Sequence, residues 1–235
     1  CMDKIELLMP AGDLTRLKIA LLYGGDAVFI GGKHFSLRAK ASNFTLEDIE
    51  EGVKFAHALN KKVYVTVNIV PHYRDLEQIE EYLKALDKIH VDALIVSSLY
   101  IINLIKKLNL NLEAHVSTQV SAMNQETLMF YKSLGATRVV LARECTLPEI
   151  NALAGSKITE IEVFIHGGLC SSISGRCSLS NYMVLRDANR GGCAHSCRWE
   201  YHLYQDNQLV SPDSFPIGSK DLCGIKKVPD LIEAN

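Results

Sequence analysis

The stretch KVYVTVNIVPHYRDLEQIEEYLKALDKIHVDALIVSS (62–98) carries the pattern that decides the fold. Two runs rich in β-branched residues, at 62–70 and 93–98, flank a segment with one apolar face. That face is formed, at helical spacing, by Leu76, Ile79, Leu83 and Leu86. Apolar strands joined by an amphipathic helix are typical of a parallel sheet that helices cover on the outside. The stretch therefore predicts a strand–helix–strand unit.

The same unit recurs on both sides of this stretch. Further strand-like runs lie at 5–12, 27–32, 112–120, 138–144 and 160–167, and further helical patterns at 13–24, 45–60, 99–109, 124–135 and 146–155. Such a chain can form a doubly wound open sheet or a (β/α) barrel. No glycine-rich phosphate loop follows the first strand, which removes the usual reason for an open sheet. Because polar residues also gather where strands end, we expect an α/β fold, an incomplete or modified TIM-like barrel.

The pattern changes after Gly167 and predicts three regions. Residues 1–167 hold the barrel units. Residues 168–218 are rich in Cys, Gly, Ser and Arg, so we expect a Cys-rich insertion after the seventh strand, with a hairpin at 199–210. Residues 219–235 predict the start of a further helix. Because an eighth strand is lacking, we expect either a fragment of a longer protein or a barrel closed in another way.

Composition and charge narrow the class of protein. The chain has 235 residues, of which 48% are hydrophobic and 22% charged, and these values exclude whole-chain disorder, collagen and coiled coil. A net charge of −2 gives no global signature of nucleic-acid binding, so a basic surface must be local. No apolar run reaches the roughly twenty residues of a membrane span, and the N-terminus has no signal-peptide pattern. We therefore expect a cytoplasmic protein with no membrane partner.

Cysteines gather in the last third of the chain. They are Cys170, Cys177, Cys193, Cys197 and Cys223, and the first four follow the spacing C-x6-C-x15-C-x3-C. A reducing cytosol disfavours disulfides, so clustered thiols there favour zinc or an iron–sulfur cluster. The irregular spacing favours a cluster, because zinc ligands usually come as two close pairs. Inert buried thiols and disulfides remain the alternatives.

Arginines and aromatic residues are interleaved with these cysteines. The candidate substrate-binding residues are Arg176, Arg186, Arg190, Arg198 and Trp199. Guanidinium groups bind phosphate or carboxylate, and aromatic faces stack on bases. The pattern predicts a local surface for RNA or a carboxylate, although a solvated loop with salt bridges fits it equally well.

Polar residues near the strand ends supply candidates for the barrel mouth. His115, Ser117 and Gln119 alternate along one predicted strand, so we expect them to point the same way. Arg143 lies at the end of the sixth strand and His166 at the end of the seventh. The candidate catalytic residues are therefore His115, Gln119, Arg143 and His166. A buried His115 without a catalytic role and a His166 that only caps its strand are the alternatives.

Two motifs resemble the signature of the peptidase U32 family, also called collagenase-like. EVFIHGGLCSSISGRCSLS (162–180) matches the family pattern from its glutamate to its last serine, with Gly168 where alanine or serine is usual. NRGGCAHSCRWEY (189–201) adds the third cysteine of the family. The segments 6–32, 115–124 and 138–144 look similar to the family as well.

This resemblance implies a TIM-like barrel with a 4Fe–4S cluster and, in the branch that the chain looks most like, hydroxylation of a tRNA wobble uridine. The implied partners are tRNA and a prephenate-like carboxylate as hydroxyl source, with a second U32-family chain as a further partner. By this resemblance, the expected metal ligands are Cys170, Cys177 and Cys193, with Cys197 as the fourth ligand and Cys223 as its alternative.

Two other functions stay open at this point. A peptidase with a cysteine nucleophile would need one indispensable cysteine and no iron. A zinc-stabilised RNA-binding domain would hold zinc and carry out no reaction.

Overall fold

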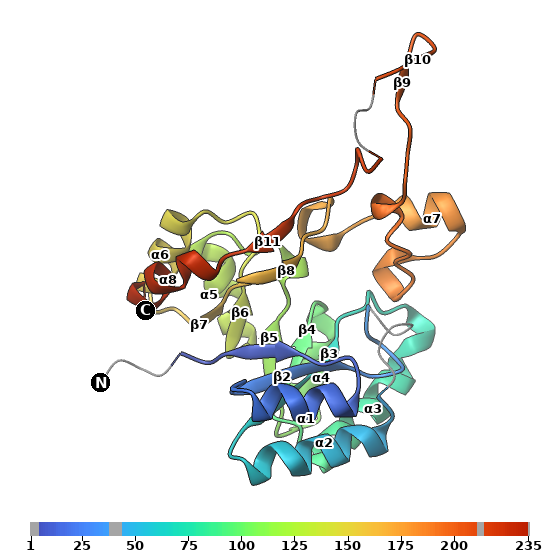
Figure 1. Ribbon diagram of the computed structural model, residues 1–235. Helices are drawn as coiled ribbons and strands as arrows, with labels where there is room; N and C mark the ends of the chain where they lie inside the picture. The colour runs from blue at the N-terminus through green and yellow to red at the C-terminus, as the bar shows by residue number, and fades with distance from the viewer. Residues whose placement is uncertain (1–4, 38–43, 211–213, 235) are drawn as a thin grey trace.

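Seven parallel strands form one curved sheet in the computed structural model of the chain, which describes residues 5–37, 44–210 and 214–234 (Figure 1). The strands are β1 (Leu8–Pro10), β2 (Ala27–Gly31), β3 (Lys62–Val67), β4 (Ala93–Val96), β5 (Glu113–Val116), β6 (Arg138–Val140) and β7 (Glu160–Glu162). Each strand pairs with the next one in the chain. Because β1 and β7 do not pair within the described residues, the sheet is a curled half-barrel. The predicted incomplete TIM-like barrel is confirmed.

Helices cover the outer face of this sheet. They are α1 (Leu14–Leu22), α2 (Leu46–Ala58), α3 (Leu76–Ile89), α4 (Leu99–Lys107), α5 (Gln125–Leu134) and α6 (Leu147–Gly155). Side chains at the helix starts fix several of these bounds: Asp13 caps α1, Asn124 caps α5, and Thr45 forms a capping box with Asp48 on α2. The predicted apolar face of α3 is largely buried, with Ile79, Leu83 and Leu86 fully enclosed.

The core lies between the helices and the outer face of the sheet. On β3, Val63, Val65 and Val67 join this large apolar cluster, whereas Tyr64 points to the other face. This alternation follows from the two-residue period of a strand. Because the helices cover only one face, the side chains of the concave face form the half-barrel interior.

An ion-pair network crosses this interior. Arg138 on β6 donates to Glu6, before β1, at 2.6 Å and to Glu160 on β7 at 2.9 Å. The hydroxyl group of Tyr64 donates to both carboxylate oxygens of Glu6, at 2.9 and 2.8 Å. The network therefore ties the chain before the first edge strand to the opposite edge, where backbone pairing is lacking.

The Cys-rich segment is folded from short elements. They are β8 (His166–Gly168), η3 (Ile173–Gly175), α7 (Leu179–Val184), η4 (Ala188–Arg190), η5 (Ser196–Arg198), β9 (Tyr204–Gln205) and β10 (Gln208–Leu209), where η denotes a 3-10 helix. The predicted hairpin is confirmed as β9 and β10, which project from the rest of the chain (Figure 1). Its turn at Asp206 and Asn207 has positive φ at both residues.

Three predicted elements differ in the structure. The strand expected at 160–167 is split, because β7 ends at Glu162 and β8 pairs antiparallel with β11 (Asp221–Cys223). The strand expected at 112–120 ends at Val116 and is followed by η2 (Thr118–Val120). The helix expected from residue 219 is preceded by β11 and η6 (Ile225–Lys227), and α8 (Val228–Glu233) begins only after them, with Pro229 in its first turn.

No helix in the described part of the chain is long and apolar enough to cross a membrane.

Candidate functional site

A pocket of about 590 Å³ lies between the half-barrel and the Cys-rich segment. Its barrel wall is formed by Val70, His72, Ser97 and Gln119, and its opposite wall by Arg176, Cys177, Ser178, Asp187 and Asn189. The barrel wall follows the carboxyl ends of β3, β4 and β5, which is the end at which (β/α) barrels place their active sites. The pocket therefore is the candidate active site.

Two polar side chains of the barrel wall are held in place by local hydrogen bonds. Ser97 donates to the carbonyl oxygen of Asn68 at 3.0 Å, and Ser117 donates to the amide oxygen of Gln119 at 3.3 Å. Gln119 is 7% exposed, so its amide group is almost enclosed. Of the four predicted catalytic residues, Gln119 is the one that lines the pocket.

His115 does not lie on one strand with Gln119, because β5 ends at Val116 and Gln119 lies in η2. Its ring is fully buried, packs edge-on against Tyr64, and has Nε2 3.2 Å from Glu113 Oε2. Burial lowers the pKa of His115, which favours the neutral ring. The structure therefore places His115 inside the half-barrel and outside the pocket lining.

Arg143 and His166 also lie away from the pocket lining. The guanidinium of Arg143 lies over the Phe164 ring at 5.6 Å and donates to the carbonyl oxygen of Gly168 at 3.5 Å. His166 is exposed on β8, in register with Cys223 on β11. Because β8 belongs to a separate small sheet, His166 does not end a barrel strand.

Two predicted substrate-binding arginines are occupied by ion pairs. Arg190 binds both carboxylate oxygens of Asp75, at 2.6 and 3.1 Å, and also donates to the carbonyl oxygen of Val70. Arg190 lowers the pKa of Asp75 to about 2. Arg198 donates to Asp221 at 2.8 Å and to the carbonyl oxygen of Leu169 at 3.1 Å. Both arginines therefore hold the Cys-rich segment together or to the barrel.

The other two arginines of the segment have no ion pair within the described residues. Arg176 lines the pocket and offers it a cationic group. Arg186 is partly buried, and its Nε has no hydrogen-bond partner among the described residues. Trp199 is 37% exposed and does not line the pocket. The arrangement therefore singles out Arg176 as the cation available to a bound ligand.

The cysteines are reduced, and two of them accept backbone hydrogen bonds. The Sγ of Cys170 accepts from the Ser172 N–H at 3.5 Å, and the Sγ of Cys177 from the Leu179 N–H at 3.3 Å. Such donors stabilise thiolates, so the chemistry of these two positions fits metal ligation. Cys193 and Cys223 are exposed, and Cys197 is half-buried.

The same cysteines do not form a closed site for one metal ion. Within residues 5–37, 44–210 and 214–234, no three His, Cys, Asp or Glu side chains converge as ligands of a single ion. The thiolates of an iron–sulfur cluster bind different irons, so they do not have to meet at one point. The cluster on Cys170, Cys177, Cys193 and Cys197 therefore stays a prediction, as does zinc.

Several residues of the site were missed by reasoning from sequence, among them His72, Asp187 and Asn189. His72 follows β3 along the chain, Asp187 precedes η4, and Asn189 lies within η4, next to Arg190. Their positions after a strand end or beside an arginine were signals in the sequence, but their meeting depends on how the Cys-rich segment folds back. The N–H of Val70 donates to the carbonyl oxygen of Asn189 at 3.1 Å, and this bond brings the two walls together.

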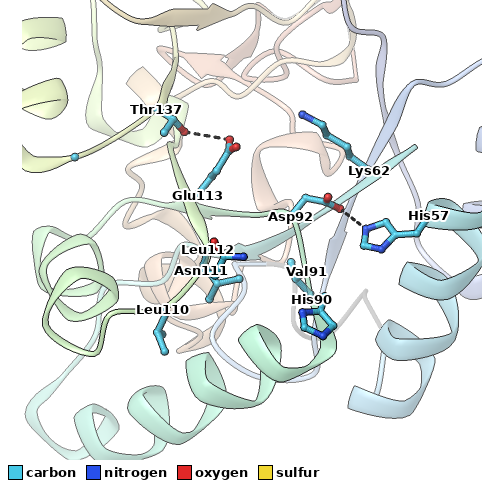
Figure 2. Close-up of a pocket in the computed structure, with 11 residues that line it drawn as sticks. His57, Lys62, His90, Val91, Asp92, Leu110, Asn111, Leu112, Glu113 and Thr137 are labelled. Carbon is cyan, nitrogen blue, oxygen red and sulfur yellow. Dashed lines mark hydrogen bonds and ion pairs between the residues drawn. The ribbon is translucent and has the colours of Figure 1, made fainter. Parts of the chain in front are cut away.

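A second pocket, of about 450 Å³, opens at the opposite end of the strands (Figure 2). His57 contacts Asp92 at 3.1 Å and Thr137 donates to Glu113 at 3.3 Å, whereas Lys62 also borders the space. In (β/α) barrels this end serves stability. We therefore assign the candidate active site to the pocket at the carboxyl ends.

Comparisons with known proteins agree with this fold. The family model described as peptidase family U32 matches residues 12–235. The solved structure of the U32 peptidase Mk0906 superimposes with a TM-score of 0.58 at 14% identity and covers 70% of each chain. At this identity the likeness shows the fold alone.

Two curated relatives are much more similar in sequence. The tRNA hydroxylation protein P1 of Bacillus subtilis (strain 168) is 47% identical over 98% of this chain and 56% of its own length. The tRNA hydroxylation protein P of Escherichia coli (strain K12) is 42% identical over 88% of this chain and 46% of its own length. The chain thus spans about half the length of these relatives. From the family match and these identities, the chain belongs to peptidase family U32.

Proposed function

We propose that this chain takes part in the hydroxylation of tRNA at a wobble uridine, with the pocket beside Arg176 as its reaction site. The observation that carries the proposal is the similarity to the Bacillus subtilis tRNA hydroxylation protein P1, which extends over 98% of this chain. Because the chain spans 56% of that protein, further parts of such a protein can contribute to the reaction.

The pocket offers groups that suit a uracil base and an anionic co-substrate. Gln119, Ser97 and Asn189 present amide and hydroxyl groups, which can pair with the carbonyl and imide groups of uracil. Arg176, with no carboxylate partner in the described chain, can bind a carboxylate through two parallel hydrogen bonds. A prephenate-like carboxylate is the co-substrate that we propose for it.

The proposed cofactor is a 4Fe–4S cluster on Cys170, Cys177, Cys193 and Cys197, with Cys223 as the alternative fourth ligand. When bound, such a cluster would supply redox or Lewis-acid chemistry next to the pocket, which Cys177 lines. The backbone N–H groups of Ser172 and Leu179, which donate to the Sγ atoms of Cys170 and Cys177, support the proposal. The role of this chain's own residues is to bind and orient the base and the carboxylate.

We further propose a cytoplasmic location, where tRNA and reduced thiols are both found, and a second U32-family chain as a partner. The absence of a membrane-spanning helix in the described residues is compatible with this location.

The test is an anaerobic assay of the purified protein with unmodified tRNA and a prephenate-like carboxylate, read out as hydroxylated uridine by nucleoside mass spectrometry. Arg176→Ala should raise the KM for the carboxylate, and Arg176→Lys should restore part of the binding. Arg16→Ala, on the exposed surface of α1, is the control. A wild-type protein that forms no hydroxylated nucleoside under these conditions would refute the proposal.

A further inference from the structure

Large side chains are unusually exposed in the segments that form the two walls of the candidate pocket. Tyr73 is 93% exposed and directly follows His72 of the barrel wall, and Tyr182 (85%) and Leu185 (93%) lie between Ser178 and Asp187 of the opposite wall. Among the described large hydrophobic residues, no others reach 85% except Tyr23. Three of the four most exposed side chains of this class therefore lie, along the chain, within four residues of the lining of one pocket.

The backbone that carries these side chains is held firmly. Tyr73 lies in η1 (Tyr73–Asp75), where the His72 N–H donates to Asp75 at 2.7 Å and the Asp75 N–H to the carbonyl oxygen of His72 at 2.9 Å. On the other side, the Leu185 N–H donates to Asn181 at 3.1 Å. A backbone that is already ordered loses little further conformational freedom when its side chains bind a partner.

Leu185 is an unfavourable residue for its position in two ways. It ends α7 with φ of 54°, in the left-handed region that glycine usually occupies at a helix C-terminus. Its apolar side chain is also almost fully exposed to water. Strain and exposure that the fold does not need are typical of a side chain with a role in binding.

The cations around the pocket are consistent with this role. Arg74 follows Tyr73, Arg186 follows Leu185, and Arg176 lies in the pocket, and none of the three has an ion pair within the described residues. Residues 170–190 carry three arginines and one aspartate, in a chain whose net charge is −2. Exposed aromatic faces next to unpaired guanidinium groups are the chemistry that recognises unstacked bases in single-stranded RNA.

We propose that Tyr73, Tyr182 and Leu185 form an RNA clamp around the pocket, in which the bases on either side of the target nucleotide stack on the two tyrosines. Leu185 fills the space that the target base leaves in its stack when it enters the pocket, as apolar wedges do in other nucleic-acid complexes. The clamp rests on the proposed function and adds to it the residues that select a single-stranded loop.

The experiment measures binding of fluorescent RNA to the full chain without any turnover. One probe is a hairpin RNA with a uridine in its single-stranded loop, and the other is the same sequence annealed into a continuous duplex. Tyr73→Ala and Tyr182→Ala should each weaken hairpin binding about tenfold, because stacking on an aromatic side chain contributes that order of affinity per base. Neither tyrosine variant should change how steeply RNA binding weakens with rising salt concentration. Arg186→Gln should make this decline less steep, because it removes a charge that can contact phosphate.

The Leu185→Gly variant distinguishes an effect on RNA binding from an effect on the stability of the fold. Glycine relieves the left-handed backbone, so this variant should unfold at the same temperature as the wild type or higher, and yet bind the hairpin more weakly. Tyr23→Ala is the matched control, because Tyr23 is 85% exposed but lies at the end of α1, next to the amino end of β2. Its RNA binding should equal that of the wild type.

The outcomes distinguish the clamp from the proposed function. If the wild type binds neither probe, the proposed function on tRNA is overturned together with the clamp. If the wild type binds the hairpin but the Tyr73, Tyr182 and Leu185 variants bind it equally well, or if the duplex binds as tightly as the hairpin, the clamp alone is overturned.

Discussion

Arg190 of the Cys-rich segment donates hydrogen bonds to both carboxylate oxygens of Asp75, which precedes α3, with N–O distances of 2.6 and 3.1 Å. The two side chains are 18% and 13% exposed, so water screens this pair only in part. Arg190 was predicted to hold substrate, but the structure uses it to fasten one wall of the candidate pocket to the other. The salt-bridged alternative considered from sequence therefore applies to Arg190 and also to Arg198.

Arg190→Ala should destabilise the protein by about 2–4 kcal/mol, because it leaves Asp75 partly buried without its cation. Urea unfolding measures this loss. Arg198→Ala is the matched control, since Asp221, its partner, is 66% exposed, and its effect should stay below about 1 kcal/mol. Equal losses for the two variants would show that the Arg190–Asp75 pair does not anchor the segment.

The same pair predicts acid sensitivity. The pKa of Asp75 is about 2 in the folded chain, against 3.8 for an ordinary aspartate, so the unfolding chain takes up a proton at pH values between these two. The stabilisation is therefore complete above about pH 4 and is lost as the pH falls towards 2. With allowance for screening it amounts to about 1–2 kcal/mol. Asp75→Asn should flatten this part of the stability–pH curve, and an unchanged slope would contradict the assignment.

Much of the barrel was predictable because its signals are local. The β-branched run of β3 and the apolar face of α3 depend on residues close in sequence, and both elements appear where the pattern placed them. The split of the seventh predicted strand was not predictable in the same way. The pairing of His166 with Cys223 joins residues far apart in the chain, and periodicity within 160–167 contains no information about such a partner.

Arg138 should be among the least replaceable polar residues of the fold. It is 11% exposed and has carboxylate oxygens of Glu6, Glu160 and Glu162 within 3.5 Å. Arg138→Met should destabilise the chain by about 3–5 kcal/mol, because it leaves several carboxylates close together without their cation. Tyr64→Phe, which removes one donor to Glu6, should cost about 1 kcal/mol. Chemical denaturation compares the two, and a smaller loss for Arg138→Met would contradict this account.

Glu162, the first residue of the family signature, should make the protein less stable as the pH rises. Burial raises its pKa to about 7 from 4.5, so the folded chain binds a proton that the unfolded chain releases between these values. Stability therefore falls from about pH 4.5 to 7 and levels off above. Glu162→Gln should remove this decline and raise the melting temperature at pH values above 7. Glu126→Gln, exposed on α5, is the control and should leave the curve unchanged.

The site was less predictable than the fold, and the reason lies in the Cys-rich segment. Strand ends indicated Gln119, which lines the pocket, because a barrel brings the carboxyl ends of its strands to one rim. The segment has no periodic pattern, so its path could not be derived. Which arginine would meet Asp75 and which would remain unpaired in the pocket depends on that path, and the roles of Arg190 and Arg176 therefore required the structure.

The clustered cysteines should hold iron. Anaerobically purified protein should contain iron and sulfide in equal amounts, and it should be brown. Cys170→Ser and Cys177→Ser should each lose most of the iron, because both thiols already accept backbone N–H groups that favour a bound thiolate. Cys145→Ser is the control: this thiol lies 3.9 Å from the carbonyl oxygen of Ala122, and burial raises its pKa, which disfavours a thiolate.

Comparing the iron content of Cys197→Ser with that of Cys223→Ser then identifies the fourth ligand. A colourless protein with one equivalent of zinc would contradict the cluster and support the zinc site. Iron retained in the Cys170 and Cys177 variants would show that other residues are the ligands.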